Sequence, residues 1–276
     1  MSKVGAVAAG LACAALTQAA AFGAGPSPGF SQNGITRGDV RYVTVQGSGT
    51  TIAAVDREGG RILRSKAFGT SWGIPLVSFD GTAGGLSSDG RTLILSDTNG
   101  VNPEAKRTSF LVLDTKRFRV LQKLRLKGSW SFDALSPDAR TMYLIEHLYA
   151  GGDPTHYRVR AYDLRKQHLL ARVISDKSTW ETDMQGMPIS RLADDGWAYT
   201  LYGGPGPRPF IHALDTRRAN AVCIDLPWKN PQPDKIFQFR LRQDGDGHLV
   251  VRGPHGRALA VVDIREKRLL SFVRNP

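Results

Sequence analysis

The feature that most constrains the fold is a unit that recurs five times along the chain. A short apolar run closed by aspartate appears as "TIAAVD", "SFLVLD", "RVRAYD", "FIHALD" and "ALAVVD", and successive aspartates lie 48 to 58 residues apart. These aspartates are Asp56, Asp114, Asp163, Asp215 and Asp263. A repeat of this length predicts a stack of similar supersecondary units, each packed against its neighbours.

Two further landmarks keep the same phase. A tryptophan follows four of the five aspartates by 13 to 17 positions, at Trp72, Trp130, Trp180 and Trp228. A polar turn then precedes a new alternating run, as in "SSDGRTLIL", "SPDARTMYL", "ADDGWAYTL" and "DGDGHLVV". Three landmarks that share one phase indicate a true structural repeat.

Each unit divides into four short runs of alternating apolar and polar residues, which is the pattern of antiparallel strands joined by turns. Four such strands per repeat are typical of a β-propeller blade. We therefore predict an all-β chain with a single β-propeller of about five four-stranded blades. A six-bladed ring and an open arrangement are the alternatives. The blades are predicted at 38–68, 84–127, 132–174, 187–226 and 236–274, with "NGITRGD" (33–39) completing the first blade.

The residues also resemble a known class of repeat. "LSPDARTMYL", "RVRAYDL" and "LLARVI" resemble the YVTN/lactonase-like repeats of bacterial propellers, as does "RYVTV" at 41–45. The resemblance covers residues 38–274 and implies a propeller fold, although those families commonly have seven blades. It also implies that acidic and asparagine side chains near the channel mouth hold a divalent cation.

The N-terminal segment differs in composition from the repeats. Residues 1–21 are rich in Ala, Val, Leu and Gly after an early lysine, and Ala19 and Ala21 offer a cleavage site. This pattern predicts a cleaved secretory signal peptide, with a permanent membrane anchor as the alternative. Residues 22–37 are expected to form a flexible lead, and 38–276 the propeller domain. We expect a secreted, periplasmic or cell-envelope protein without a membrane span after cleavage. Its only mature cysteine, Cys223, then forms no internal disulfide.

The net charge of +12 is concentrated on the turns and outer strands of one face, which we call the tight-turn face. This basic rim comprises Arg64, Lys66, Lys116, Arg117, Arg119, Lys123, Arg125, Lys127, Arg165, Lys166, Arg217, Arg218, Lys267 and Arg268. It suits an anionic polymer, but lysine and arginine on outer strands also prevent edge-to-edge pairing. Only Phe118 offers aromatic stacking among these charges, so the sequence gives no specific signal for nucleic acid.

The opposite face, which we call the loop face, is expected to carry the long loops and the repeated tryptophans. The predicted ligand-binding set is Trp72, Trp130, Asp133, Trp180, Glu181, Asp183 and Trp228. Tryptophans beside carboxylates suit a sugar or a cation. The alternative is that each tryptophan packs between neighbouring blades and buries its large apolar surface.

A metal site is predicted from mixed nitrogen and oxygen ligands on the same face. The candidate ligands are Glu146, His147, Asp153, His156, Asp97 and Asn99. A divalent cation is therefore the one cofactor that the sequence suggests. "DGDGH" (244–248) lacks the later ligands of a calcium loop and is interpreted as a hairpin turn.

These observations favour an exported binding or interaction module over an enzyme. Its Trp- and acid-rich loop face would bind a small ligand or an envelope protein. The alternative is a lactone or ester hydrolase in which a divalent metal polarises a carbonyl group and activates water.

Overall fold

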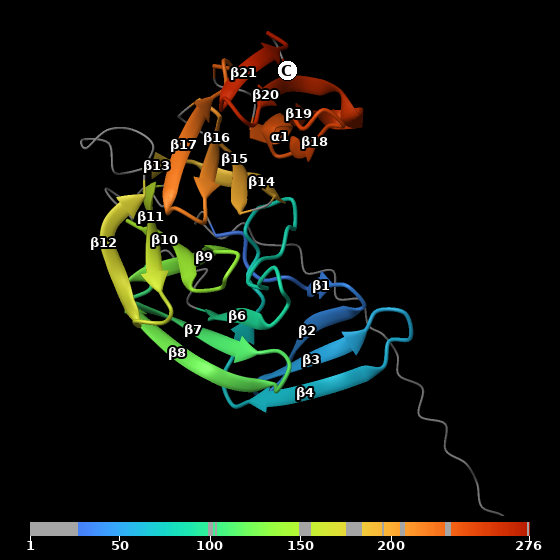
Figure 1. Cartoon of the computed structure of the whole chain (residues 1–276), viewed down its shortest axis with the longest axis vertical. Coiled ribbons are helices and arrows are strands. Elements are labelled where there is room, and N and C mark those ends of the chain that lie inside the picture. The colour runs from blue at the N-terminus through green and yellow to red at the C-terminus, as the bar shows by residue number, and fades with distance from the viewer. Residues whose placement is uncertain are drawn as a thin grey trace, which may run out of the picture.

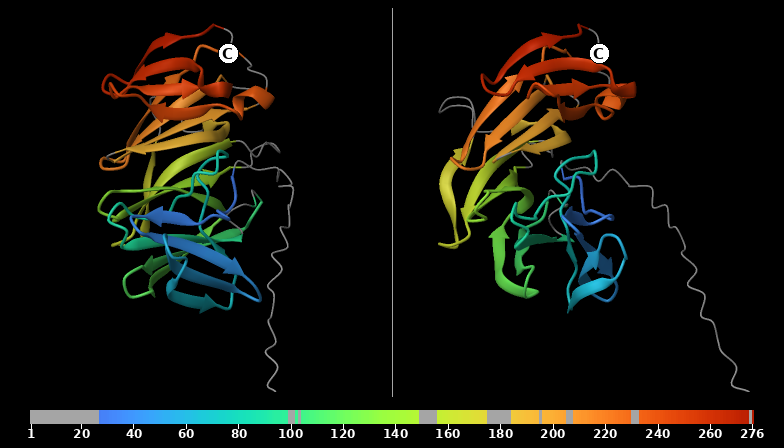
Figure 2. Two further views of the ribbon diagram at one scale, coloured as in Figure 1. Left: turned by 90° about the vertical axis from the view of Figure 1, so that its right-hand side faces the viewer. Right: turned by 45° about the vertical axis from the view of Figure 1, so that its right-hand side comes forward.

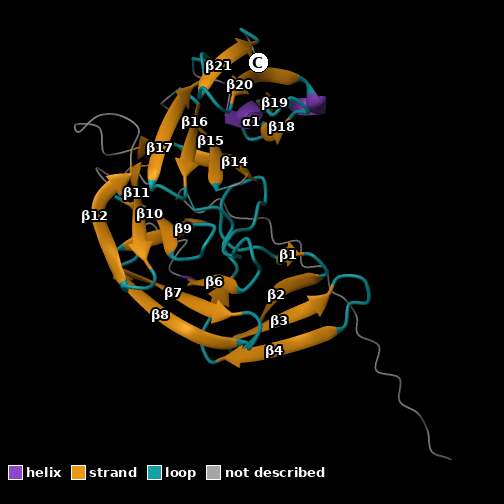
Figure 3. Ribbon diagram, viewed as in Figure 1, coloured by secondary structure: helices purple, strands orange, loops and turns teal. Residues whose placement is uncertain are grey.

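The repeat becomes five antiparallel sheets in the computed structural model, arranged one after another along an arc (Figures 1 and 2). Four of the sheets have four strands, and the third has an additional short strand. The structure describes residues 27–98, 102, 104–148, 156–174, 184–194, 196–204, 208–229, 233–274 and 276. Strands make up most of the described chain, and helix is confined to short turns (Figure 3). None of the helices in these ranges has the length and apolar character needed to cross a membrane.

Each sheet is one blade, numbered from the N-terminus. Blade 1 contains β1 (Ile35–Arg37), β2 (Val40–Gln46), β3 (Thr50–Asp56) and β4 (Ile62–Phe68). Blade 2 contains β5 (Trp72–Gly73), β6 (Thr92–Asp97), β7 (Arg107–Asp114) and β8 (Arg119–Lys127). Blade 3 contains β9 (Ser129–Leu135), β10 (Thr141–His147), β11 (His156–Asp163) and β12 (His168–Ile174), with β13 (Met184–Gln185) paired to β11. Blade 4 contains β14 (Met187–Asp194), β15 (Trp197–Gly203), β16 (Phe210–Asp215) and β17 (Asn220–Asp225). Blade 5 contains β18 (Arg240–Gln243), β19 (Leu249–Arg252), β20 (Ala258–Asp263) and β21 (Arg268–Phe272), preceded by α1 (Pro233–Ile236).

The five predicted blades are confirmed, and the ring is open. Figure 1 shows blades 1 and 5 as the two ends of the arc, and none of the four hydrophobic clusters found among the described residues joins them. The prediction that "NGITRGD" completes blade 1 is also confirmed, because β1 lies within that stretch and pairs with β2. The sheet therefore begins inside the segment predicted as a flexible lead.

The predicted start of blade 2 at residue 84 is wrong. Its first strand is β5, where Trp72 pairs with Asp97, and residues 74–91 form a long connection to β6. We call this connection the central loop. The apolar residues of the loop alternate as in a strand, but the loop forms only isolated bridges, namely Pro75 with Phe30, Leu76 with Ala83 and Leu86 with Leu93.

The recurrent aspartate makes the same turn in every blade. In each case its Oδ1 accepts hydrogen bonds from the backbone N–H groups two and three residues later, as with Lys116 and Arg117 for Asp114. The residue four positions after the aspartate then adopts a left-handed conformation with φ between 53° and 65°. These five residues are Gly60, Phe118, Gln167, Ala219 and Lys267. The repeated aspartate is therefore a turn-forming residue, since a short side-chain acceptor satisfies backbone donors that the tight turn leaves unpaired.

An internal blade is apolar on both of its faces because a neighbour covers each face. In β6, Leu93 and Leu95 pack in a cluster with blade 1, whereas Ile94 between them packs in a cluster with blade 3. All three side chains are fully buried. Continuous apolar runs in a strand thus mark a blade that is covered on both sides.

The central loop braces the arc across its middle. Phe79 N–H donates to the Pro188 carbonyl oxygen at 2.8 Å, and Asp80 N–H donates to the Ile189 carbonyl oxygen at 3.0 Å. The Phe79 ring also meets the Phe237 ring edge-on, with 5.6 Å between ring centroids. The loop therefore ties blade 2 to blades 4 and 5, which are distant in sequence.

Asp80 is the centre of this brace. Its Oδ1 accepts hydrogen bonds from Ser78 Oγ at 2.6 Å and from Thr82 Oγ1 at 2.7 Å. Its Oδ2 accepts one from Ser190 Oγ at 2.6 Å, and that hydroxyl in turn accepts from Leu241 N–H at 2.9 Å. Burial raises the pKa of Asp80, but the hydrogen bonds from Ser190, Ser78 and Thr82 outweigh burial and leave the pKa below its ordinary value.

Asp80→Asn is expected to lower the free energy of unfolding by about 1–2 kcal/mol, because a charged acceptor of several hydrogen bonds becomes a neutral amide. Chemical denaturation measures the change. The matched control is Asp89→Asn: Asp89 accepts an equivalent bond from Ser87 Oγ at 2.6 Å in an exposed hairpin turn. Equal losses for the two variants would contradict the bracing role of Asp80.

Candidate functional site

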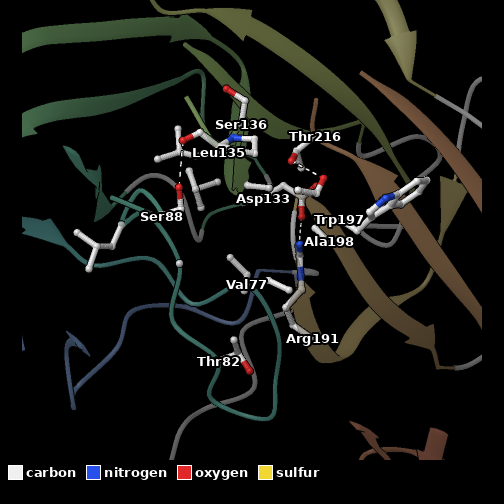
Figure 4. Close-up of a pocket in the computed structure, with 18 of the residues that line it drawn as sticks. Val77, Thr82, Ser88, Asp133, Leu135, Ser136, Arg191, Trp197, Ala198 and Thr216 are labelled. Atoms are coloured by element: carbon white, nitrogen blue, oxygen red, sulfur yellow. Dashed lines mark hydrogen bonds and ion pairs between the residues drawn. The ribbon is translucent and has the colours of Figure 1, made fainter. Parts of the chain in front are cut away.

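A cavity of about 570 Å³ opens at the tight-turn face of the channel (Figure 4). The central loop lines one side through Val77 and Thr82, and the ends of β9 and β14 line the other. Hairpin turns form the mouth, where Ser88 Oγ donates to the Pro137 carbonyl oxygen at 3.0 Å. The cavity thus exists because the long central loop folds into the channel of an open arc.

A buried ion pair forms part of the cavity wall. Asp133 lies in β9 at a bulge in its pairing with β10, and Arg191 lies in β14 of the next blade. The Arg191 Nη2 group donates to Asp133 Oδ1, and both side chains are at most 4% exposed. Figure 4 shows the two side chains meeting across the channel wall. The pair gives this blade junction a fixed charged centre.

Polar side chains continue behind this pair into the junction of blades 3 and 4. Ser131 Oγ and His147 Nε2 are 2.6 Å apart, and both residues are buried. The pairing of β14, β15 and β16 places Arg191, Thr200 and His212 in one row across blade 4. The junction therefore contains two buried histidines and one buried ion pair.

Burial determines the ionisation of both histidines. It lowers the pKa of His147 to about 4. It likewise lowers the pKa of His212 to about 4, with smaller contributions from Asp133, which raises the pKa, and Arg191, which lowers it. His147 Nδ1 and His212 Nε2 have no hydrogen-bond partner among the described residues. Both rings are therefore neutral at pH 7.

The rim of the cavity has a small excess of positive charge. Arg37, Asp194 and Arg217 line it together with the internally neutral pair. Arg217 lies against Gly196, where a Cβ atom would come within 2.4 Å of the arginine Nε, and Gly196 also has φ of +82°. Glycine is therefore required at this turn both for its backbone conformation and for the position of Arg217.

Trp197, the one tryptophan outside the repeated set, lies at the rim of the cavity. Its ring stacks on Tyr199 with 5.9 Å between centroids, and Lys267 Nζ lies 3.9 Å from its centroid. In Figure 4 the ring points away from Asp133. Trp197 therefore shapes the rim and packs toward blade 5, and its ring is not a stacking platform inside the cavity.

The structure places three of the four predicted ligand-binding tryptophans in the blade junctions. Trp72, Trp130 and Trp228 are only 2–3% exposed. Trp130 Nε1 donates to the Lys127 carbonyl oxygen at 2.8 Å, and Trp228 Nε1 donates to the Val273 carbonyl oxygen at 2.7 Å. A ligand cannot stack on rings that neighbouring blades already cover. Of the predicted set within the described residues, only Asp133 lines the cavity.

The described members of the predicted metal set do not converge. Glu146 forms an ion pair with Arg160 at 2.9 Å, while the adjacent His147 bonds to Ser131 on the opposite face of β10. Asp97 Oδ2 accepts from Ser109 N–H at 2.9 Å, and His156 pairs with Gln185 at the start of β11. Charge pairing and strand alternation thus direct these groups to different partners.

Five predicted residues lie outside the described residues, and so does the predicted signal peptide. These residues are Asn99, Asp153, Trp180, Glu181 and Asp183. Much of the predicted loop face falls in the same ranges. The binding prediction for those positions stays a prediction.

One group among the described residues has the spacing to hold a cation. It consists of Asp244, Asp246 and His248, whose ligand atoms lie within 4.8 Å of one another. Asp244 Oδ1 accepts hydrogen bonds from the backbone N–H groups of Asp246 and His248, at 3.0 and 2.8 Å. These bonds form the hairpin turn that the sequence predicted, and they explain the arrangement without a cation.

The predictions from sequence did not include Arg191, Trp197 or the central loop as parts of the site. Arg191 was hidden because "ISRLA" reads as an ordinary strand. A charge at the centre of that strand, on the face that packs against blade 3, was the available signal. The length of the segment between Trp72 and "SSDGRTLIL" was a second signal, because it exceeds the corresponding segments after Trp130 and Trp180.

Comparison with known proteins is limited to the fold. No protein-family model matches the chain, and no curated protein matches it. Among solved structures, it is similar to hydrazine synthase of Kuenenia stuttgartiensis, with 15% identity over 90% of this chain and 66% of that chain and a TM-score of 0.46. It is also similar to the Cps50 (Swd1) β-propeller domain of Myceliophteria thermophila, with 13% identity over 91% and 70% of the two chains and a TM-score of 0.47. The dihydro-heme d1 dehydrogenase NirN matches with 13% identity over 91% and 58% and a TM-score of 0.41.

The fold and the cavity together define the class of protein. Five consecutive four-stranded antiparallel blades around a central channel make the chain a β-propeller, here with an open ring. The chain spans 66% of the matched hydrazine synthase chain and 58% of the NirN chain, so it is shorter than both. The resemblance to YVTN/lactonase-like repeats stays a prediction.

Proposed function

We propose that this propeller is a binding module and that the cavity at its tight-turn face takes a small polar ligand with negative charge. The observation that carries the proposal is a cavity of about 570 Å³ with the buried Asp133–Arg191 pair in its wall. Small-molecule sites typically measure about 300–1,000 Å³ and combine apolar walls with a few fixed polar groups. The cavity has both properties.

The sign of the ligand charge follows from the rim. Because Asp133 neutralises Arg191, the remaining charged groups of the lining are Arg37, Arg217 and Asp194. The formal charges of these three described groups sum to +1, which favours an anionic ligand, and the net charge of +12 adds a long-range attraction. Guanidinium groups also match carboxylate and phosphate geometry.

Thermal unfolding with citrate, phosphate, glucuronate and uncharged glucose as probes tests the proposal. At least one anionic probe is expected to raise the melting temperature, by about 5–10 °C at a hundredfold excess over its Kd. Ala193 is exposed and lines the cavity, so Ala193→Phe is expected to abolish the shift by filling the space.

Ala171→Phe is the matched control, because Ala171 is also exposed but lies on β12, outside the cavity lining. It is expected to keep the full shift. The proposal fails if none of the anionic probes shifts the melting temperature, or if the shift is the same in Ala193→Phe and wild type.

A further inference from the structure

The two ends of the open arc have different chemistry. An internal blade is covered on both faces. Among the described residues, blade 1 packs only on the side of blade 2, and blade 5 only on the side of blade 4. Each end blade therefore has one sheet face without a neighbouring blade (Figure 1). We call these the blade 1 end face and the blade 5 end face. In repeat proteins a terminal repeat needs a polar outer face to remain soluble alone.

The blade 1 end face has kept the apolar character of an internal blade. Tyr42 and Ile52 point toward blade 2, so the residues that alternate with them lie on the end face. The apolar members of this face are Val43, Val45, Ala53, Val55 and Ile62. Val45 and Ile62 are 60% and 64% exposed, the highest values for large apolar residues in the described chain. Strand pairing makes these five residues a diagonal stripe in which Ala53 is only 4% exposed. The polar residues beside the stripe are Arg41, Thr51 and Ser65.

The blade 5 end face has the polar character of a terminal cap. Leu241 and Val251 pack toward blade 4, so Arg240, Arg242 and Arg252 lie on the end face. The guanidinium groups donate to backbone carbonyl oxygens, and within the described chain no carboxylate pairs with any of the three. Val250 on the same face is only 3% exposed, so its surroundings already cover it. The large apolar residues that this blade exposes, Leu270 and Phe272 at 42% and 47%, lie on its outer strand β21, whereas the arginines occupy the inner strands β18 and β19.

We propose that the blade 1 end face is a docking surface for a second copy of this chain, which binds through its own blade 1 end face. Two identical arginine-rich faces would repel each other, and pairing the apolar stripe with arginines would bury unpaired charge. When the apolar stripes of two copies pack against each other, apolar surface is buried without charge repulsion and without burial of unpaired arginines. The contact is isologous, so it closes after two copies and leaves the polar blade 5 end faces outermost.

The size of the face sets the expected strength. Seven-residue strands are about 23 Å long and neighbouring strands lie about 4.8 Å apart, which gives a face on the order of 400 Å² per copy. A standard specific interface buries roughly twice that area per partner. We therefore expect a reversible dimer with a Kd of about 1–100 µM.

Sedimentation velocity of the purified chain over a concentration series up to about 200 µM tests the proposal. The wild type is expected to shift reversibly from one chain mass to two. The double variant Val45→Glu/Ile62→Glu is expected to stay at one chain mass, because its two faces then repel each other. Both side chains are exposed in the single chain, so these changes are expected to leave the melting temperature of the monomer unchanged.

Leu121→Glu is the matched control. Leu121 is 50% exposed on β8 of blade 2, away from the blade 1 end face, and its replacement is expected to leave the dimer intact. The proposal is overturned if the wild type remains a single chain at the highest concentration. It is equally overturned if the double variant still dimerises, or if a different protein occupies the face while the pure chain stays monomeric.

Discussion

Arg191→Met is expected to lower the free energy of unfolding by about 3–5 kcal/mol, because it leaves the Asp133 carboxylate buried without its partner. Asp133 is 4% exposed and holds Arg191 across the junction of blades 3 and 4. For a chain of this size the loss corresponds to a fall in melting temperature on the order of 10 °C. Thermal and chemical denaturation, each followed by circular dichroism, measure the change.

Two variants show whether burial of an unpaired charge is the cause. In Asp133→Leu/Arg191→Met both charges are removed, so most of the stability is expected to return, as replacement of a buried pair by apolar residues is often neutral. Arg218→Met breaks a pair with Asp215 in which Arg218 is 84% exposed, and it should cost less than about 1 kcal/mol. A loss below 1 kcal/mol for Arg191→Met itself would contradict the buried-pair assignment.

Acidification is expected to destabilise the protein before most of its carboxylates are protonated. His147 and His212 have pKa values of about 4 in the folded chain, compared with roughly 6.5 for an unfolded histidine. Between these values the unfolded chain binds protons that the folded chain does not. Stability is therefore complete above about pH 6.5 and is lost as the pH falls toward 4, by on the order of 3 kcal/mol per histidine.

The free energy of unfolding measured at intervals from pH 7.5 to 4 checks this expectation. His147→Gln and His212→Gln should each flatten the profile, because each removes one proton-binding group from the unfolded chain. His168→Gln is the control, since His168 is exposed on β12 and its loss is expected to leave the slope unchanged. A profile that is equally steep in all three variants and wild type would refute the role of the buried histidines.

The local features of the fold were predictable because they depend on neighbouring residues. Alternation of apolar residues identified most of the strands, and the repeated aspartate marked the turn after the third strand of every blade. The side chain of Asp114, for example, satisfies backbone N–H groups only two and three positions away. The same logic correctly identified "DGDGH" as a hairpin turn, where Asp244 accepts from His248 N–H at 2.8 Å.

The site was less predictable because its parts are distant in sequence. Tryptophans at regular spacing suggested a ligand surface, yet the packing of neighbouring blades buries Trp72, Trp130 and Trp228. Period and phase describe where a side chain lies along its repeat. They do not report how closely the next blade approaches, and that approach decides whether an aromatic ring is core or surface.

By itself the sequence determined the repeat, the four-stranded blade and the turn chemistry, since each follows from short-range periodicity and hydrogen bonding. Only the tertiary structure decided that the ring stays open, that residues 74–91 cross the channel, and that a cavity forms beside them. Only it brought Asp133 to Arg191, which are 58 positions apart. The physical reason is that such contacts depend on the angle and spacing between blades, which arise from the packing of whole sheets. No local pattern encodes that geometry.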